Sequence, residues 1–239
     1  MRFLRNHQAQ QEENHFWISI SDLMTSLLFI FILILAYMIL EYQDKQNIAQ
    51  KKIEAFEKNV NTRSELLCKL QLNLKKKGIS VEIDTDEGAM RITRERLFDS
   101  SKADIRKDKI WIIKEVANEI LNFMEQDKYK KAINTIYIEG HTDNVKLNKS
   151  KCGFRWTNME LSAQRAINTF LLMDKLTNGA FSKLKNKNGE ALISYSGYAD
   201  TRPIKGVSND TKEGRERNRR IQFFFAVNPP SIEEIKSVN

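Results

Sequence analysis

The sequence predicts an α+β protein with a single N-terminal transmembrane helix, a helical connector and a C-terminal α/β sandwich domain. Three observations support this prediction. A long apolar run lies near the N-terminus, a stretch without Pro or Gly follows it, and strand-like and helix-like segments then alternate to the end. We expect an N-terminal tail over 1–15, the transmembrane helix over 16–40, the connector over 41–77 and the domain over 78–239.

Composition excludes several classes of protein. Of the 239 residues, 41% are hydrophobic and 29% charged, which is typical neither of a multi-span membrane protein nor of a disordered acidic tail. The net charge of +8 suits nucleic acid, anionic lipid or an acidic polymer and selects none of them. Two cysteines, Cys68 and Cys152, are too few for a disulfide-dense scaffold. They could pair only if their Cα atoms lie within about 7 Å, which the sequence does not establish.

Residues 16–40 form the predicted membrane span. At 1.5 Å per residue they make roughly 37 Å of helix, enough to cross a hydrocarbon core of about 30 Å. No small-residue cleavage site follows the run, so we expect an uncleaved anchor rather than a signal peptide. Trp17 at one end, and Tyr37 and Tyr42 at the other, suit the two membrane interfaces.

Asp22 is the one charged side chain in this span. An acid at mid-membrane costs at least about 2.5–3.5 kcal/mol and normally faces protein or a water-filled path. Ser19, Thr25 and Ser26 lie three or four residues away and therefore share its helical face. This polar stripe favours ion carriage by Asp22 over the alternative, in which the side chain snorkels to the headgroups. Either way a single helix cannot shield the acid alone, so ion carriage requires a partner.

Residues 41–77 predict an amphipathic helix that ends at Gly78. Its apolar positions comprise Ile53, Phe56, Val60, Leu67, Leu70 and Leu74. Polar residues near position 60 interrupt the pattern and suggest a break there. The stripe could pair with a second copy of the chain, or its Leu67–Leu74 half could pack on the chain's own domain.

The C-terminal domain shows alternating strands and helices. Expected strands lie at 79–83 and 89–93, which flank a hairpin turn, and at 135–139, 191–196 and 220–227. Expected helices lie at 108–125 and at about 159–177, the second with Leu161, Ala166, Phe170 and Leu171 directed inward.

Four blocks in this domain resemble, in order, the signature motifs of the OmpA-like peptidoglycan-binding domain. They are IYIEGHTDN (136–144), NMELSAQRA (158–166), YSGYADTRPI (195–204) and EGRERNRRIQF (213–223). The resemblance implies a βαβαβ-type fold that grips the diaminopimelate of the cell-wall stem peptide. By motif position, the residues implied in binding are Asp143, Asn158, Leu161 and Arg165.

The chemistry of Asp143 and Arg165 agrees with that role. A zwitterionic amino-acid end needs a carboxylate for its ammonium group and a guanidinium fork for its carboxylate. Two structural alternatives stay open: Asp143 could cap the following turn, and Arg165 could pair with a core acid. The extra stretch Lys146–Trp156 lengthens the spacing between them, and could cap the site or change its ligand.

Other functional classes find little support. Arg215, Arg217, Arg219 and Arg220 alternate with other residues in a way that suits local pairing, and no nucleic-acid-binding motif accompanies them. No His, Cys and acid spacing suits a metal, and no arrangement of serines with a base suggests catalysis. We therefore expect no enzyme activity, no metal and no cofactor.

A transmembrane acid ahead of an OmpA-like domain resembles the B subunits of ion-driven stators of the flagellar MotB type. The segment D-L-M-T (22–25) and the aliphatic run after it are most similar to the B subunits of the Zorya anti-phage system. The resemblance implies H⁺ or Na⁺ as the carried ion, and two copies of this chain inside five multi-span MotA/ZorA-like A subunits. A flagellar role and a passive membrane-tethered peptidoglycan anchor are the alternatives.

The resemblance also implies an inner-membrane protein with a cytoplasmic N-terminus and a periplasmic domain. Counting Lys and Arg points weakly the other way, because Lys45, Lys51, Lys52 and Lys58 follow the span whereas only Arg2 and Arg5 precede it. We give more weight to the wall-binding motifs, since peptidoglycan lies beyond the cytoplasmic membrane.

Overall fold

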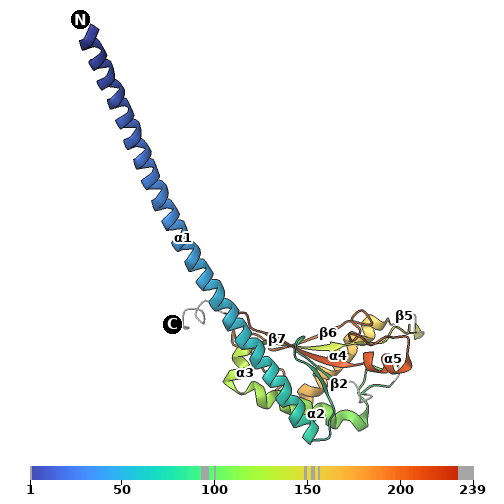
Figure 1. Cartoon of the computed structure of the whole chain (residues 1–239). Helices are drawn as coiled ribbons and strands as arrows, with labels where there is room; N and C mark the ends of the chain where they lie inside the picture. Colours follow the sequence, from blue (N-terminus) through green and yellow to red (C-terminus); the bar gives the residue numbers. More distant parts are fainter. Residues whose placement is uncertain are drawn as a thin grey trace. The chain divides into compact units, whose positions relative to one another are not determined.

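A computed structural model describes residues 2–92, 97–99, 101–147, 150–151, 154–155 and 157–230. It divides the chain into two compact units, of which the second spans Ala55–Ser231 and the first includes Met1–Glu54. The helix α1 (Arg2–Lys76) runs through this boundary without a break (Figure 1). The second unit therefore includes the last turns of α1, whereas the sequence pattern placed the start of the domain at residue 78.

The predicted break near residue 60 is wrong, because the polar residues there find partners that leave the helix intact. The Asn59 amide donates to the Asn228 carbonyl at 3.0 Å, and the Thr62 hydroxyl donates to the Lys58 carbonyl at 2.8 Å. The helix stops where expected. Gly78 takes a φ of +79°, and the Ile79 amide returns to the Leu74 carbonyl at 2.9 Å, as in a glycine C-cap.

Among the described residues, α1 is the one helix long and apolar enough to cross a membrane. Its most apolar 18-residue window has a mean hydropathy of 2.7, and none of that window is buried. A soluble helix would cover such a face against a core, so this exposure is typical of a segment whose surroundings are lipid or another protein.

The domain contains a five-stranded sheet in the order β1-β2-β7-β3-β6. The pair β3 and β6 is parallel and joined through α4, and the other neighbours are antiparallel. The strands are β1 (Glu82–Asp84), β2 (Ala89–Ile92), β3 (Ile133–Gly140), β6 (Ile193–Gly197) and β7 (Ile221–Val227). The expected hairpin and the expected α/β sandwich are both confirmed.

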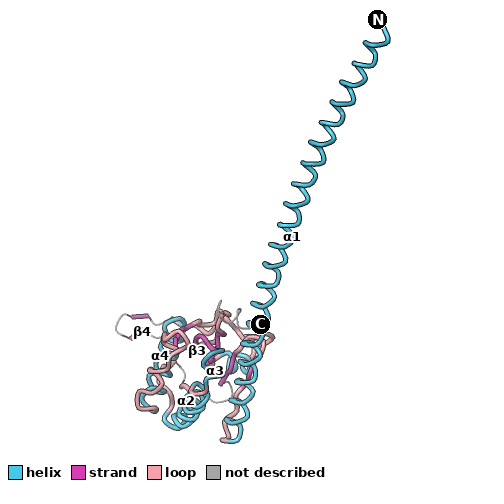
Figure 2. The backbone as a smooth tube through the Cα atoms, turned by 90° about the vertical axis from the view of Figure 1, so that its left-hand side faces the viewer, coloured by secondary structure: helices cyan, strands magenta, loops and turns pink. Residues whose placement is uncertain are grey.

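In the part of the domain that the structure describes, five helical elements and a small second sheet accompany this sheet. The helices are η1 (Lys107–Lys109), α2 (Ile110–Met124), α3 (Asp127–Ala132), α4 (Asn158–Leu176) and α5 (Lys212–Asn218). The short strands β4 (Ser150–Lys151) and β5 (Phe154–Arg155) pair with each other. Figure 2 shows β4 at the edge of the domain away from the last turns of α1.

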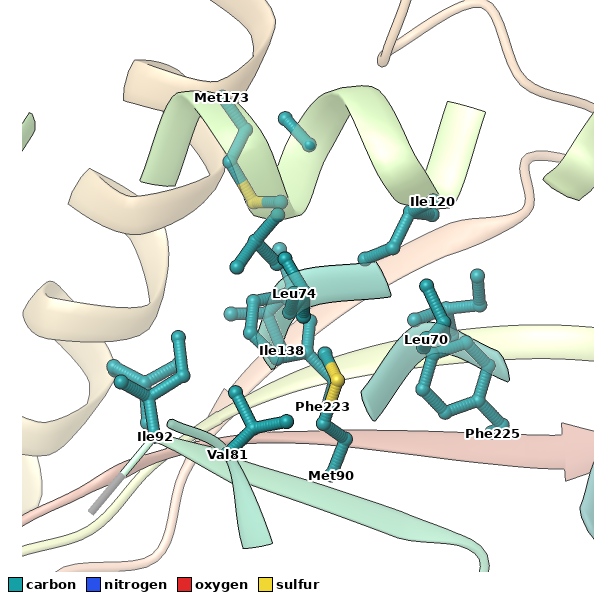
Figure 3. Packing of buried hydrophobic residues seen from close by; sticks show 14 of the residues in the cluster. Leu70, Leu74, Val81, Met90, Ile92, Ile120, Ile138, Met173, Phe223 and Phe225 are labelled. Carbon is teal, nitrogen blue, oxygen red and sulfur yellow. The ribbon is translucent and has the colours of Figure 1, made fainter. Parts of the chain in front are cut away.

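The core lies between one face of the sheet and the helices α1, α2 and α4. Figure 3 shows Leu70 and Leu74 of α1 pointing into the same cluster as Met90, Phe223 and Phe225 of the sheet. Leu66, Leu67, Leu70 and Leu74 have no exposed surface. The Leu67–Leu74 half of the connector therefore packs on the chain's own domain. Ile53 and Phe56 stay about half exposed.

One predicted core position in α4 is wrong. Leu161 and Ala166 are buried and Phe170 packs against the core, but 56% of Leu171 is exposed. At about 100° per residue, Leu171 lies far around the helix from the buried positions Ala166 and Met173. A single exposed leucine is ordinary on a folded surface.

Candidate functional site

The site forms where β3 ends and α4 begins. Two glycines allow α4 to lie directly on the strand ends: a Cβ atom at Gly140 would come 2.0 Å from the Ser162 carbonyl oxygen, and one at Gly197 would come 2.3 Å from the Ala163 nitrogen. Thr157 and Glu160 form a capping box that fixes the first turn of α4. The loop after β3 and the first turns of α4 are therefore held close together.

Asp143 sits in that loop with only 6% of its surface exposed. One carboxylate oxygen accepts from the Val145 amide at 3.1 Å, so the residue does cap the turn. The other oxygen accepts from Nη1 of Arg219 at 2.5 Å. The Asn158 amide donates to the carbonyls of Asp143 and Val145, each at 3.1 Å, and holds the loop against α4.

Arg165 lies on α4, one turn after Leu161, and 3% of its surface is exposed. Its Nε donates to the Lys102 carbonyl at 3.0 Å, and its guanidinium lies 4.7 Å from the centre of the Phe98 ring. Burial, and to a lesser extent the neighbouring Arg219, lower its pKa to about 10, and Asp143 opposes the shift. The group stays charged at neutral pH. Within the described part of the chain its hydrogen bonds go to carbonyl oxygens and it forms no ion pair, so the alternative in which it pairs with a core acid is wrong.

The structure thus brings together Asp143, Asn158, Leu161 and Arg165, and it adds Arg219. Leu161 is 5% exposed and shares the helical face of Arg165. Two guanidinium groups and one carboxylate meet here, which leaves an excess of one positive charge. Such a cluster can bind a ligand that carries both a carboxylate and an ammonium group. It should bind the carboxylate more strongly, because two guanidinium groups face it.

Sequence reasoning assigned Arg219 to local pairing and missed its place in this site. Its main partner, Asp143, is 76 positions away along the chain. Arg217 likewise pairs at 3.1 Å with Glu82 in β1, and Arg215 donates to the carbonyls of Asn209 and Asp210. The expected local pairing is therefore not the main one: Arg217 and Arg219 pair chiefly with carboxylates distant in sequence, and Arg215 binds nearby backbone carbonyls.

Asp22 lies far from this cluster in sequence, in the other unit of the chain. Because α1 is a continuous helix there, Ser19, Thr25 and Ser26 share the face of Asp22, and all four are exposed. The Thr25 hydroxyl donates to the Ser21 carbonyl at 2.7 Å, which leaves its oxygen available as an acceptor.

The remaining predicted features are only partly described. The stretch Lys146–Trp156 contains the β4–β5 pair, but Cys152 and Trp156 lie outside the described residues. Cys68 is an exposed free thiol on α1. In the described ranges, no three His, Cys, Asp or Glu side chains gather as a metal site would require.

Comparison with known proteins agrees with this geometry. The model of the OmpA family matches residues 97–219. Motility protein B of Bacillus subtilis is 31% identical over 143 residues, which cover 59% of this chain and 46% of that protein. Zorya protein ZorB of Escherichia coli is 24% identical over 230 residues, which cover 92% of this chain and 85% of that one.

A crystal structure described as a putative MotB-like protein from Desulfovibrio vulgaris has the same fold, with a TM-score of 0.56 and 18% identity over 72% of this chain and 99% of that chain. The chain spans about half the length of the motility proteins B that it matches. The family match covers just over half of the 239 residues and includes the whole Asp143–Arg219 cluster. The chain belongs to the OmpA family.

Proposed function

We propose that this chain is the B subunit of an ion-driven rotary motor of the bacterial inner membrane, which carries the ion on Asp22 and anchors the motor to peptidoglycan through its OmpA-family domain. One observation carries the proposal: Asp22, the single carboxylate in the exposed apolar span of α1, is joined within one chain to a domain with a buried carboxylate and guanidinium cluster. The buried cluster alone would suit a passive wall anchor equally well, and Asp22 is the feature that distinguishes a motor subunit from it.

The membrane half of the proposal rests on the surroundings of Asp22. An exposed acid in an apolar helix costs at least about 2.5–3.5 kcal/mol in lipid, so it needs protein around it. We propose that multi-span MotA/ZorA-like subunits, expected as five around two copies of this chain, cover the stripe formed with Ser19, Thr25 and Ser26. Moving one charge through 100 mV releases about 2.3 kcal/mol. Because each ion would have to bind Asp22 on its way across, this free energy would be coupled to rotation. The carried ion is H⁺ or Na⁺.

The wall half rests on the Asp143–Arg165 cluster. A diaminopimelate end offers a carboxylate to Arg165 and Arg219, and an ammonium group to Asp143. Since Arg219 already holds one oxygen of Asp143, the ligand's ammonium group would share that carboxylate with Arg219. This role requires the domain to lie in the periplasm and residues 1–15 in the cytoplasm.

Anti-phage defence is the biological role we favour over flagellar motility. The alignment with ZorB runs through most of both chains, whereas the alignment with motility protein B of B. subtilis covers less than half of that protein. A passive wall anchor is the third possibility, and it differs from both in having no need of Asp22.

The test is the substitution Asp22→Asn, which keeps the side-chain shape and removes the charge. We expect loss of phage protection, or of motility if the role is flagellar, with unchanged protein level in the membrane. Asp44→Asn is the matched control, because Asp44 is exposed on the same helix just beyond the span. Full activity of Asp22→Asn would contradict ion carriage and leave the passive anchor.

A further inference from the structure

The face of the sheet that turns away from the helices carries a pocket of about 750 Å³. Side chains alternate along a strand, so this face receives the residues between the core positions of β2, β3 and β7. It presents Arg91, Glu139 and Gln222, whereas the core face presents Met90, Ile138 and Phe223. A buried layer of charged and amide groups on an otherwise regular sheet calls for an explanation, because such groups are normally exposed to water.

His141 is the clearest sign of a missing partner in this pocket. Only 1% of its surface is exposed, and neither ring nitrogen makes a hydrogen bond with any described residue. Its Nε2 lies 3.5 Å from the Glu139 carboxylate, beyond ordinary hydrogen-bond length, and its ring stacks on Tyr198 with centroids 5.6 Å apart. Burial lowers its pKa although the nearby Glu139 opposes the shift, so at neutral pH the imidazole offers one donor and one acceptor.

The cations of the pocket outnumber its acids. Arg91, Arg202, Lys205 and Arg220 line it together with Glu87 and Glu139, which gives a formal charge of 4 − 2 = +2. The acids are already engaged: Glu87 pairs with Arg91, and Glu139 accepts from the Gln222 amide at 3.0 Å. The pocket therefore has positive charge that its own carboxylates do not neutralise.

Three of these cations have no carboxylate partner within the described part of the chain. Arg220 is 5% exposed and donates only to uncharged oxygens, those of Gln222, Asn218 and Arg202. The guanidinium of Arg202 lies 3.8 Å from the centre of the Tyr198 ring, which orients it at the rim. Lys205 is exposed beside it. A buried arginine and two oriented rim cations around one cavity are typical of a site for an anionic group.

We propose that this open-face pocket binds a small ligand through a phosphate or carboxylate group, held by Arg220 from the floor and by Arg202 and Lys205 from the rim, with His141 hydrogen-bonded to it. The site is separate from the Asp143 cluster. Adjacent residues serve the two, since Arg219 pairs with Asp143 while Arg220 lines the pocket. The inference does not depend on the proposed motor function.

The test is calorimetric titration of the full chain in detergent with inorganic phosphate and, separately, with succinate. We expect saturable binding of at least one probe, and the probe that binds identifies the source of the anionic group. Arg202→Gln and Lys205→Gln, both at exposed positions, should each weaken binding at least about tenfold. Lys183→Gln is the matched control for charge, because Lys183 is exposed and lies outside the pocket.

The nuclear magnetic resonance shifts of the His141 ring nitrogens give a second readout. Non-specific binding of the anion elsewhere on the surface would not change these shifts. Their shifts should change on titration with the probe that binds, and in Arg202→Gln the same change should require at least about tenfold more of that probe. The proposal is overturned if neither probe binds at millimolar concentration, or if Lys183→Gln weakens binding as much as the pocket variants do.

Discussion

Replacing Leu70 by Ala tests whether the end of α1 belongs to the folded domain. Leu70 has no exposed surface and lies in the cluster that contains Met90 and Phe225 (Figure 3). A buried Leu→Ala change typically costs 2–5 kcal/mol, from lost burial and the cavity left behind. Leu72→Ala is the matched control, since Leu72 lies in the same helix and is 57% exposed.

The assay is urea unfolding of the fragment Ala55–Ser231, followed by circular dichroism. With a loss of about 3 kcal/mol and a urea m-value of about 2 kcal/mol/M, Leu70→Ala should lower the midpoint by about 1.5 M. Leu72→Ala should change it by a few tenths of that amount at most. Equal midpoints for the two variants would refute the argument that α1 completes the core.

The same reasoning applies to truncation. A fragment that starts at residue 78 lacks Leu66, Leu67, Leu70 and Leu74, all of them fully buried. Four losses of this kind amount to about 8–20 kcal/mol, as large as the whole stability of an ordinary domain. We expect this shorter fragment to be unfolded, and a cooperative transition like that of the longer fragment would contradict the account.

Three further predictions concern the wall site, acid stability and topology. Asp143→Asn and Arg165→Gln should each abolish co-sedimentation of the folded Ala55–Ser231 fragment with purified sacculi. Arg217→Gln is the control and should keep co-sedimentation, because Arg217 pairs with Glu82 at the surface. Equal retention of all three variants by the sacculi would exclude the site. Lys128, Lys69 and Tyr129 lower the pKa of Glu65 to about 2, so its stabilising contribution is present above its ordinary value near 4.5 and is lost as pH falls toward 2. Glu65→Gln should therefore flatten the acid-unfolding curve in that window, and an unchanged slope would count against the pairing. In a Cys152→Ser variant, the exposed Cys68 should react with a membrane-impermeant maleimide once the outer membrane is permeabilised, and labelling only after lysis of the inner membrane would place the domain in the cytoplasm.

Much of the fold could be predicted because its signals are local. The hairpin at Asp84–Gly88 and the helical spacing of Ile112, Val116 and Ile120 depend on neighbours in the sequence. The helices α3 and α5 were missed since they are short, and their polar sequences lack an apolar face long enough to reveal a period.

The site could be predicted only in part, for a physical reason. Asp143 and Arg165 lie in recognisable motifs. Arg219, however, comes close to Asp143 only because β3 and β7 pair in antiparallel fashion. No local pattern reports such a pairing partner. The open-face pocket escaped prediction for the same reason, because His141, Arg202 and Arg220 come from three separate blocks of sequence.

Purification of the full chain from native membranes under mild detergent tests the central claim most directly. A motor B subunit must shield Asp22 inside a multi-span partner, since a lone helix leaves this acid in lipid. The account predicts co-elution with a multi-span membrane protein in a ratio near five to two copies of this chain, with Asp22→Asn assembling equally well. Elution of the wild-type chain without any multi-span partner would contradict the account and favour a passive wall anchor.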